Sequence, residues 1–149
     1  MDIKEQLRNA LKNAMVDKDT NAKNTIRMIL ANIKNAEIES QKELGYTEIV
    51  NILHKESKIR KDTIQDATTA KREDLVAQAE AELLIIQTFL PEAITKEQLQ
   101  ALTAEIIRDI HAESIKDMGK VMKALIPRLE GRVSNAEASA VVKELLSQA

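Results

Sequence analysis

The near absence of aromatic side chains constrains the fold of this chain more than any other feature. Tyr46 and Phe89 are the only aromatic residues among 149, although 44% of the residues are hydrophobic. A core must therefore be built from Leu, Ile, Val, Met and Ala. Together with abundant Lys, Glu and Gln, these residues form helices or fill helix cores, whereas strands favour aromatic and β-branched alternation. The sequence predicts an all-α fold.

Composition also narrows the class of protein. A charged content of 31% and a net charge of −2 are typical of a folded domain and not of a disordered chain. The absence of cysteine removes disulfides, thiol catalysis and thiolate metal sites. The first 15 residues are charged and amphipathic, without an apolar run long enough for a signal peptide or a membrane span. We therefore expect a cytoplasmic protein without a membrane partner.

Local signals divide the chain near residues 90 to 95. Pro91 ends a helical pattern because proline disfavours helix at the preceding residue and donates no backbone hydrogen bond. Thr95 and Gln98 then form the pattern of a capping box that starts a new helix. The sequence predicts a four-helix N-terminal domain over residues 1–92, followed by a three-helix C-terminal domain over residues 93–149.

Several helix ends can also be predicted. Asp19 or Thr20 is expected to cap the second helix, Gly45 to close its C-terminus, and Thr47 to cap the third helix. The polar second half of the third helix is expected to project beyond the core or to pack on a narrow stripe. That stripe would run through Ile59, Thr63 or Ile64, and Ala67.

No catalytic or metal-binding pattern is present in the sequence. His54 and His111 lie 57 positions apart, and neither has a histidine four residues away. There is no G-x-S-x-G elbow, no P-loop and no G-x-G-x-x-G motif, and Ser114 and Ser134 are better explained as helix caps. We therefore predict no catalytic residue, no metal and no cofactor.

The stretch from residue 116 to residue 135 is the best candidate for a specialised surface. Five basic and two acidic residues give it a net charge of +3. A glycine inside a helix is costly, so Gly119 is expected to face either a tightly packed helix or a ligand. Pro127 is expected to end or kink its helix, and Gly131 to form a tight turn that exposes Arg132 beside a helix N-terminus. The predicted contact residues are Lys116, Gly119, Lys120, Lys123, Arg128, Gly131 and Arg132. An ordinary solvated loop with surface lysines is the alternative.

A second basic run lies between residues 55 and 72, where six basic and three acidic residues again give a net charge of +3. Mixed charges along a long helix are more typical of a solvated face than of a nucleic-acid stripe. Proteins that bind single strands stack bases on aromatic side chains, and two aromatics cannot form such a platform. Any nucleic-acid binding would have to use backbone and shape, as for a folded RNA.

The whole chain resembles the YqeY family of small helical proteins. The motifs that carry this resemblance are the run from Arg27 to Glu39, Arg72–Leu75, Glu80–Leu83 leading to Phe89–Pro91, Lys116–Met122, and Gly131–Arg132. The C-terminal part is also similar to the tail domain of GatB, the B subunit of the glutamine-dependent aspartyl/glutamyl-tRNA amidotransferase. The shared signature comprises Gly119–Lys123, the Gly-Arg turn and Val141–Leu146. The chain differs from that tail by the inserted segment 125–130 and by Asn135-Ala136 in place of an Asn-Pro start.

The resemblance implies a binding protein that contacts tRNA, or a protein partner in tRNA amidation, and has no activity alone. A protein-interaction module without RNA contact is the second hypothesis. A third hypothesis, implied by the family relationship, is a carbon–nitrogen ligase that uses glutamine as amido-nitrogen donor. The sequence offers no nucleophile, metal site or ATP loop for that chemistry.

Overall fold

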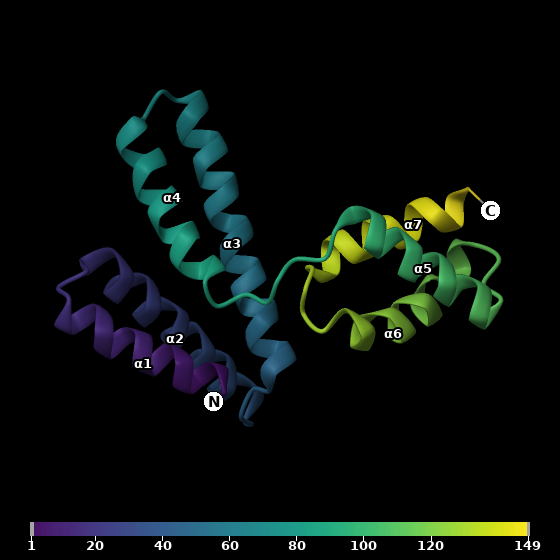
Figure 1. Ribbon diagram of the computed structural model, residues 1–149, viewed down its shortest axis with the longest axis horizontal. Coiled ribbons are helices and arrows are strands. Elements are labelled where there is room, and N and C mark those ends of the chain that lie inside the picture. The colour runs from purple at the N-terminus through teal and green to yellow at the C-terminus, as the bar shows by residue number, and fades with distance from the viewer. Residues whose placement is uncertain (1, 149) are drawn as a thin grey trace. The chain divides into compact units, whose positions relative to one another are not determined.

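The computed structural model describes residues 2–148, and these residues form seven α-helices and one 3-10 turn without any strand. The chain divides into two compact units, of which one ends at Leu90 and the other begins at Pro91 (Figure 1). The prediction of an all-α fold is confirmed. The elements are α1 (Ile3–Val16), α2 (Thr20–Ser40), α3 (Tyr46–Thr69), α4 (Glu73–Gln87), α5 (Lys96–Ile110), η1 (Ile115–Asp117), α6 (Met118–Leu129) and α7 (Asn135–Ser147).

The N-terminal unit consists of two antiparallel helical hairpins, α1/α2 and α3/α4 (Figure 1). Its core is entirely aliphatic, as the lack of aromatic residues requires, and Leu7, Ile29 and Leu53 are completely buried. Each hydrophobic position recurs every three or four residues along its helix, which places the apolar side chains on one face. The buried core residues are Ile3, Leu7, Ile26, Ile29, Ile33, Ile49, Val50, Leu53 and Ile86.

The connection between α2 and α3 differs from the sequence prediction. Asp19 caps α2, as one of the two candidates, by accepting from the N–H of Ala22. However, α2 ends at Ser40, because Gln41 takes the left-handed conformation with φ 58°. Gly45 is therefore not the C-cap of α2; it precedes Tyr46, the first residue of α3. The prediction that Thr47 caps α3 is also wrong.

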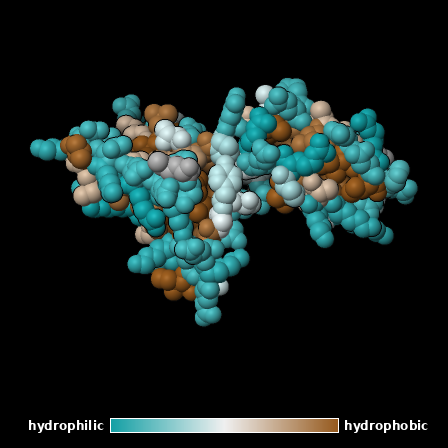
Figure 2. Space-filling view, turned by 60° about the horizontal axis from the view of Figure 1, so that its bottom comes forward, coloured by the Kyte–Doolittle hydropathy of each residue, from teal (hydrophilic) through white to brown (hydrophobic). Residues whose placement is uncertain are grey.

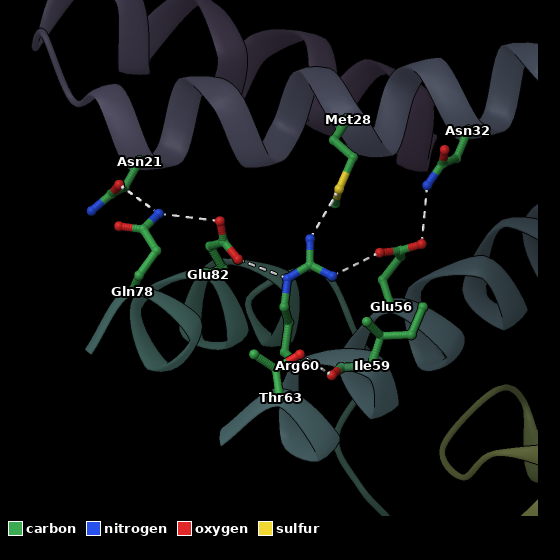
Figure 3. Close-up of polar contacts among 9 residues, drawn as sticks. All are labelled: Asn21, Met28, Asn32, Glu56, Ile59, Arg60, Thr63, Gln78 and Glu82. Atoms are coloured by element: carbon green, nitrogen blue, oxygen red, sulfur yellow. Dashed lines mark hydrogen bonds and ion pairs between the residues drawn. The ribbon is translucent and has the colours of Figure 1, made fainter. Parts of the chain in front are cut away.

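A polar seam joins α2 to the α3/α4 hairpin (Figure 3). The Arg60 guanidinium of α3 lies 3.0 Å from Glu56 and 2.8 Å from Glu82 of α4, and it also reaches the sulfur of Met28 on α2. Asn32 donates to the other oxygen of Glu56 at 3.0 Å. The expected stripe on α3 is only partly correct, since Ala67 is buried but Ile59 is 42% exposed. The arginine, and not the isoleucine beside it, is turned inward.

The hydroxyl of Thr25 on α2 is buried without a hydrogen-bond partner among the described residues. An unsatisfied buried polar group costs about 1–3 kcal/mol. We therefore expect Thr25→Val, which keeps the shape of the side chain, to raise the free energy of unfolding by about 1 kcal/mol, measured by urea denaturation. Thr103→Val is the matched control, because the buried Thr103 hydroxyl donates to the carbonyl of Leu99 at 2.7 Å. An equal gain from both substitutions would contradict this explanation.

The C-terminal unit packs α5, α6 and α7 around a second aliphatic core (Figure 1). The capping box of Thr95 and Gln98 is present in both directions, as predicted, and Ser114 and Ser134 cap the elements that follow them. Pro127 does not end its helix. It lies inside α6, which continues to Leu129. The core residues are Leu99, Ile106, Val121, Leu125, Leu129, Val133, Ala138, Val141, Val142 and Leu146.

Candidate nucleic-acid interface

Helix α6 buries one face and exposes lysines on the opposite one. Val121, Leu125 and Leu129 recur every four residues and are all buried in the C-terminal core. On the other side lie Lys120 and Lys123, with Lys116 preceding them in η1; all three are exposed, and no ion pair among residues 2–148 joins any of them. We call these three residues the lysine face. It offers three positive charges without ion pairs along about two helical turns.

The turn that begins the lysine face is fixed by a reciprocal cap. Ser114 accepts from the backbone N–H of Lys116, and the Asp117 carboxylate accepts from the N–H of Glu113 at 2.9 Å and of Ser114 at 3.4 Å. These backbone hydrogen bonds hold the pKa of Asp117 below its usual range, and the charge of Lys120 adds a smaller effect in the same direction. Asp117 therefore binds the backbone of the turn and forms no ion pair with any of the three lysines.

This cap predicts a pH dependence. Because the folded-state pKa of Asp117 lies below its ordinary value near 3.8, the carboxylate stabilises the fold above that value, and the contribution is lost as the pH falls through the folded pKa. We expect Asp117→Asn to lower stability at pH 6 and the difference from the unmodified chain to shrink at pH 3, in urea unfolding monitored by circular dichroism. Asp109→Asn, an exposed position on α5, is the control. A difference that does not depend on pH would contradict the prediction.

Gly119 does not pack against another element. A Cβ atom at this position would meet no atom within 4 Å, so the expectation of a tight helix contact is wrong. The backbone is also not in the left-handed region, since Gly131 is the glycine with a positive φ among the described residues, at 75°. Gly119 thus leaves an open, exposed backbone beside Lys120.

This openness predicts that Gly119→Ala is stabilising. Alanine is favoured over glycine within a helix by about 1 kcal/mol, and no steric cost opposes it here. We expect a gain of about 0.5–1 kcal/mol in the free energy of unfolding. Gly131→Ala is the matched control, and it should lose about 1 kcal/mol because a Cβ is disfavoured at positive φ. Destabilisation by Gly119→Ala would show that this position is packed after all.

The remaining predicted contact residues have other partners. Arg128 lies 3.8 Å from Glu105 of α5, in an exposed ion pair. Glu130 and Gly131 both have positive φ and form the turn between α6 and α7. The Nε of Arg132 donates to the carbonyl of Glu92 at 3.0 Å.

The backbone of Arg132 also takes part in this contact, because its carbonyl accepts from Ile94 at 3.1 Å. Arg132 therefore clasps the segment that precedes α5, and it is not displayed beside the N-terminus of α7 as the sequence suggested. Sequence reasoning missed Glu92 and Ile94, since a contact over 40 positions leaves no local pattern. The structure brings the three lysines together on one face without ion pairs among residues 2–148. The two arginines, Arg128 and Arg132, instead contact Glu105 and Glu92.

Half of the basic residues in the second basic run are paired with acidic neighbours. Lys58 pairs with Asp62 and Arg72 with Asp74, each at 3.1 Å, and Arg60 is held in the polar seam. Among residues 2–148, no group of three His, Asp or Glu side chains is close enough to hold a metal ion. No helix in the described part of the chain combines the length and apolar character needed to cross a membrane.

These features define a small all-α protein with two aliphatic cores, whose C-terminal unit carries three exposed lysines without ion pairs among residues 2–148. The family model described as "Yqey-like protein" matches residues 4–146, and the chain belongs to the YqeY family. The family resemblance of the sequence motifs is thereby confirmed.

The chain is also similar to three fungal proteins named "Altered inheritance of mitochondria protein 41, mitochondrial". The Kluyveromyces lactis protein is 39% identical over 108 residues, which cover 70% of this chain and 58% of that protein. The Pyrenophora tritici-repentis protein is 30% identical over 85% of this chain and 71% of that protein. The Vanderwaltozyma polyspora protein is 43% identical over 56% of this chain and 46% of that protein. The chain thus spans about half to two thirds of most of these relatives.

The names of these relatives overturn the cytoplasmic localisation expected from the sequence, because each is called a mitochondrial protein. That expectation depended on the polar, amphipathic character of the first 15 residues. Such a segment is compatible with a folded helix in more than one compartment, and here it forms α1 of the N-terminal unit. Composition alone therefore did not discriminate between the two locations.

Proposed function

We propose that this YqeY-family chain is a binding protein that contacts tRNA, or a complex engaged in tRNA amidation, through the lysine face of α6. The single observation that carries the proposal is the set of Lys116, Lys120 and Lys123, exposed on one side and without ion pairs among residues 2–148. Phosphates attract such charges, and binding releases the counterions that surround a nucleic acid. The similarity of Gly119–Lys123 to the GatB tail supports tRNA as the polyanion.

The test is a titration of the full chain with bulk tRNA at several salt concentrations. Phosphate contacts predict that the logarithm of the binding constant falls linearly with the logarithm of the salt concentration. Lys120→Glu combined with Lys123→Glu should weaken binding by about tenfold or more and reduce the magnitude of the salt slope by about 2. Lys143→Glu on α7 provides an exposed lysine from the same unit as a control. Absence of binding at low salt would refute the proposal.

The arginine clasp changes which residues this test should use. Arg132→Glu would break the hydrogen bond to Glu92 and also change the surface charge, so its effect on tRNA binding would be ambiguous. The two lysines of α6 are exposed and form no ion pair among residues 2–148, so we expect their replacement to leave the fold intact. Replacement of these two lysines therefore tests the effect of surface charge on binding without a change in the stability of the fold.

We extend the proposal to the domain organisation. Helices α1 to α4 are proposed to form one domain over residues 1–92, and α5 to α7 a second domain over residues 93–149. The chain divides into compact units between Leu90 and Pro91, so Glu92, whose carbonyl accepts from Arg132, lies in the second unit. This division supports two domains and moves their boundary two residues before the one expected from the sequence. A fragment that begins at residue 91 should accordingly unfold cooperatively at a higher temperature than one that begins at residue 96.

A protein-interaction module is the alternative function, and one observation favours it. Leu84 of α4 is 66% exposed and Leu75 of the same helix is 44% exposed, although α4 is apolar for most of its length. Figure 2 likewise shows hydrophobic residues exposed between hydrophilic ones on one face of the molecule. A pull-down that survives nuclease and high salt would support this function. Glutamine-dependent amidation by the pure chain alone would support the ligase hypothesis.

A further inference from the structure

The α1/α2 hairpin carries a net positive charge in a chain of net charge −2. Residues 3–40 include seven basic and five acidic residues, a net charge of +2. Asp17 and Asp19 lie at the turn of the hairpin, where Asp19 is used as the cap of α2, and Glu37 and Glu39 lie near the end of α2. The basic residues form no single run in the sequence, because they are spread over two helices.

The register of the hairpin brings these charges together. Lys4 of α1 forms an ion pair with Glu37 of α2 across the outer edge of their contact. One turn further along the same edge lie Arg8 on α1 and Lys34 on α2, since residues four or three positions apart share a helix face. The charge of Arg8 contributes to holding the pKa of Glu37 below its usual range, which agrees with this closeness.

The same spacing continues toward the hairpin turn. Lys12 follows Arg8 on α1, while Arg27 and Lys23 follow Lys34 on α2. The only ion pair on this edge in the described part of the chain is that of Lys4 and Glu37. We call the five cations without an ion pair the hairpin face, which comprises Arg8, Lys12, Lys23, Arg27 and Lys34.

We infer that the hairpin face binds the phosphate backbone of base-paired RNA, as a second contact surface in addition to the lysine face. This inference deepens the proposed function and rests on it, since it assigns a further surface and a class of RNA. The hairpin face has one row of cations on α1 and another on α2. The negative charges along an RNA backbone are complementary to these two rows.

The side chains between the cations favour this partner over others. Asn24, Ala31 and Asn35 are exposed on α2 among the basic residues, and amide groups donate hydrogen bonds to phosphate and ribose oxygens. Neither α1 nor α2 contains an aromatic residue on which an unpaired base could stack. Recognition must then use the shape and backbone of a duplex.

An anionic membrane is the main competing partner for a basic face. A helix that lies on a membrane inserts an apolar face between the headgroups. In this hairpin the apolar faces are already used, because Leu7, Ile26 and Ile29 are buried in the core of the N-terminal unit. The exposed apolar side chains of the hairpin, Met15, Val16 and Ile38, lie at its two opposite ends and do not form a continuous apolar face for insertion.

The test compares variants of the full chain for binding to a blunt RNA duplex, to a single strand of the same sequence and to anionic phospholipid vesicles. Arg27→Gln with Lys34→Gln removes two charges from the hairpin face at exposed positions and keeps good helix formers. We expect this variant to bind the duplex about tenfold more weakly, with a salt slope smaller by about 2. Lys55→Gln with Lys61→Gln on α3 is the matched control and should bind as the unmodified chain does.

The outcomes separate this inference from the proposed function. Weakening by the α6 variant but not by the Arg27 and Lys34 variant overturns the hairpin face and leaves the lysine face standing. Weakening by the Arg27 and Lys34 variant but not by the α6 variant overturns the lysine face and leaves the hairpin face standing. Failure of the unmodified chain to bind the duplex at low salt, with tRNA binding retained, overturns the hairpin face alone, and failure to bind either RNA overturns both. Tighter binding to the single strand, or vesicle binding that is lost in the Arg27 and Lys34 variant, overturns the assignment to base-paired RNA.

Discussion

Arg60→Met is expected to lower the free energy of unfolding of the N-terminal unit by about 3 kcal/mol. The Arg60 side chain is only 11% exposed and lies against two carboxylates, Glu56 at 3.0 Å and Glu82 at 2.8 Å. Removal of the arginine leaves both carboxylates close together, partly buried and without a counterion. An uncompensated buried charge is far more costly than the loss of an exposed ion pair. Equilibrium denaturation in urea measures the loss.

Two further variants establish the cause of this loss. Lys58→Met, two positions away on α3, removes a lysine whose pair with Asp62 is 71% and 58% exposed, and should change stability by less than about 0.5 kcal/mol. Arg60→Met combined with Glu56→Gln and Glu82→Gln removes the stranded charges and should recover most of the loss. If Arg60→Met cost no more than Lys58→Met, the polar seam would not stabilise the unit. If the triple variant recovered nothing, loss of packing and not stranded charge would be the cause.

The contrast between Arg60 and Lys58 shows where sequence reasoning reached its limit. Aliphatic periodicity predicted the helices well, because a buried face requires an apolar residue every three or four positions whatever its partner is. The two basic residues of α3 have the same local signature, and their different burial depends on Glu82, 22 positions further along the chain. The periodicity of one helix shows which of its residues share a face, but not which other helix packs against that face.

The candidate site was predictable to a similar extent. The exposure of Lys120 and Lys123 follows from the apolar repeat of α6, which fixes the opposite side as solvent-facing, whereas Lys116 precedes that helix in η1. The clasp between Arg132 and Glu92 could not be predicted, because it spans 40 positions.

Helix ends show the same distinction between local and distant causes. The cap at Thr95 was predictable, since all of its partners lie within four residues. The left-handed Gln41 was not, because glycine is the usual residue there and the side chain of Glu37 holds the following loop by accepting from Leu44.

Leu125→Ala is expected to destabilise the C-terminal unit by about 3 kcal/mol. Leu125 is fully buried near the middle of α6, where it packs with the aliphatic side chains of the second core. Truncation to alanine removes buried methyl groups and leaves a cavity that three short helices can fill only by shifting. A unit of about 60 residues has little stability to spare. The expected decrease in its melting temperature is on the order of 15 °C.

The location of this loss also tests the proposed domain organisation. If the two units unfold independently, hydrogen exchange should accelerate in α5 to α7 of the Leu125→Ala variant, while the amides of α1 to α4 keep their protection. Ile115→Ala is the matched control in the same unit, because Ile115 is 47% exposed and its loss should cost less than about 1 kcal/mol. Faster exchange across all seven helices would instead mean that the chain unfolds as one cooperative domain. In that case the lysine face and the hairpin face would be parts of a single folded body and would not be carried by separate domains.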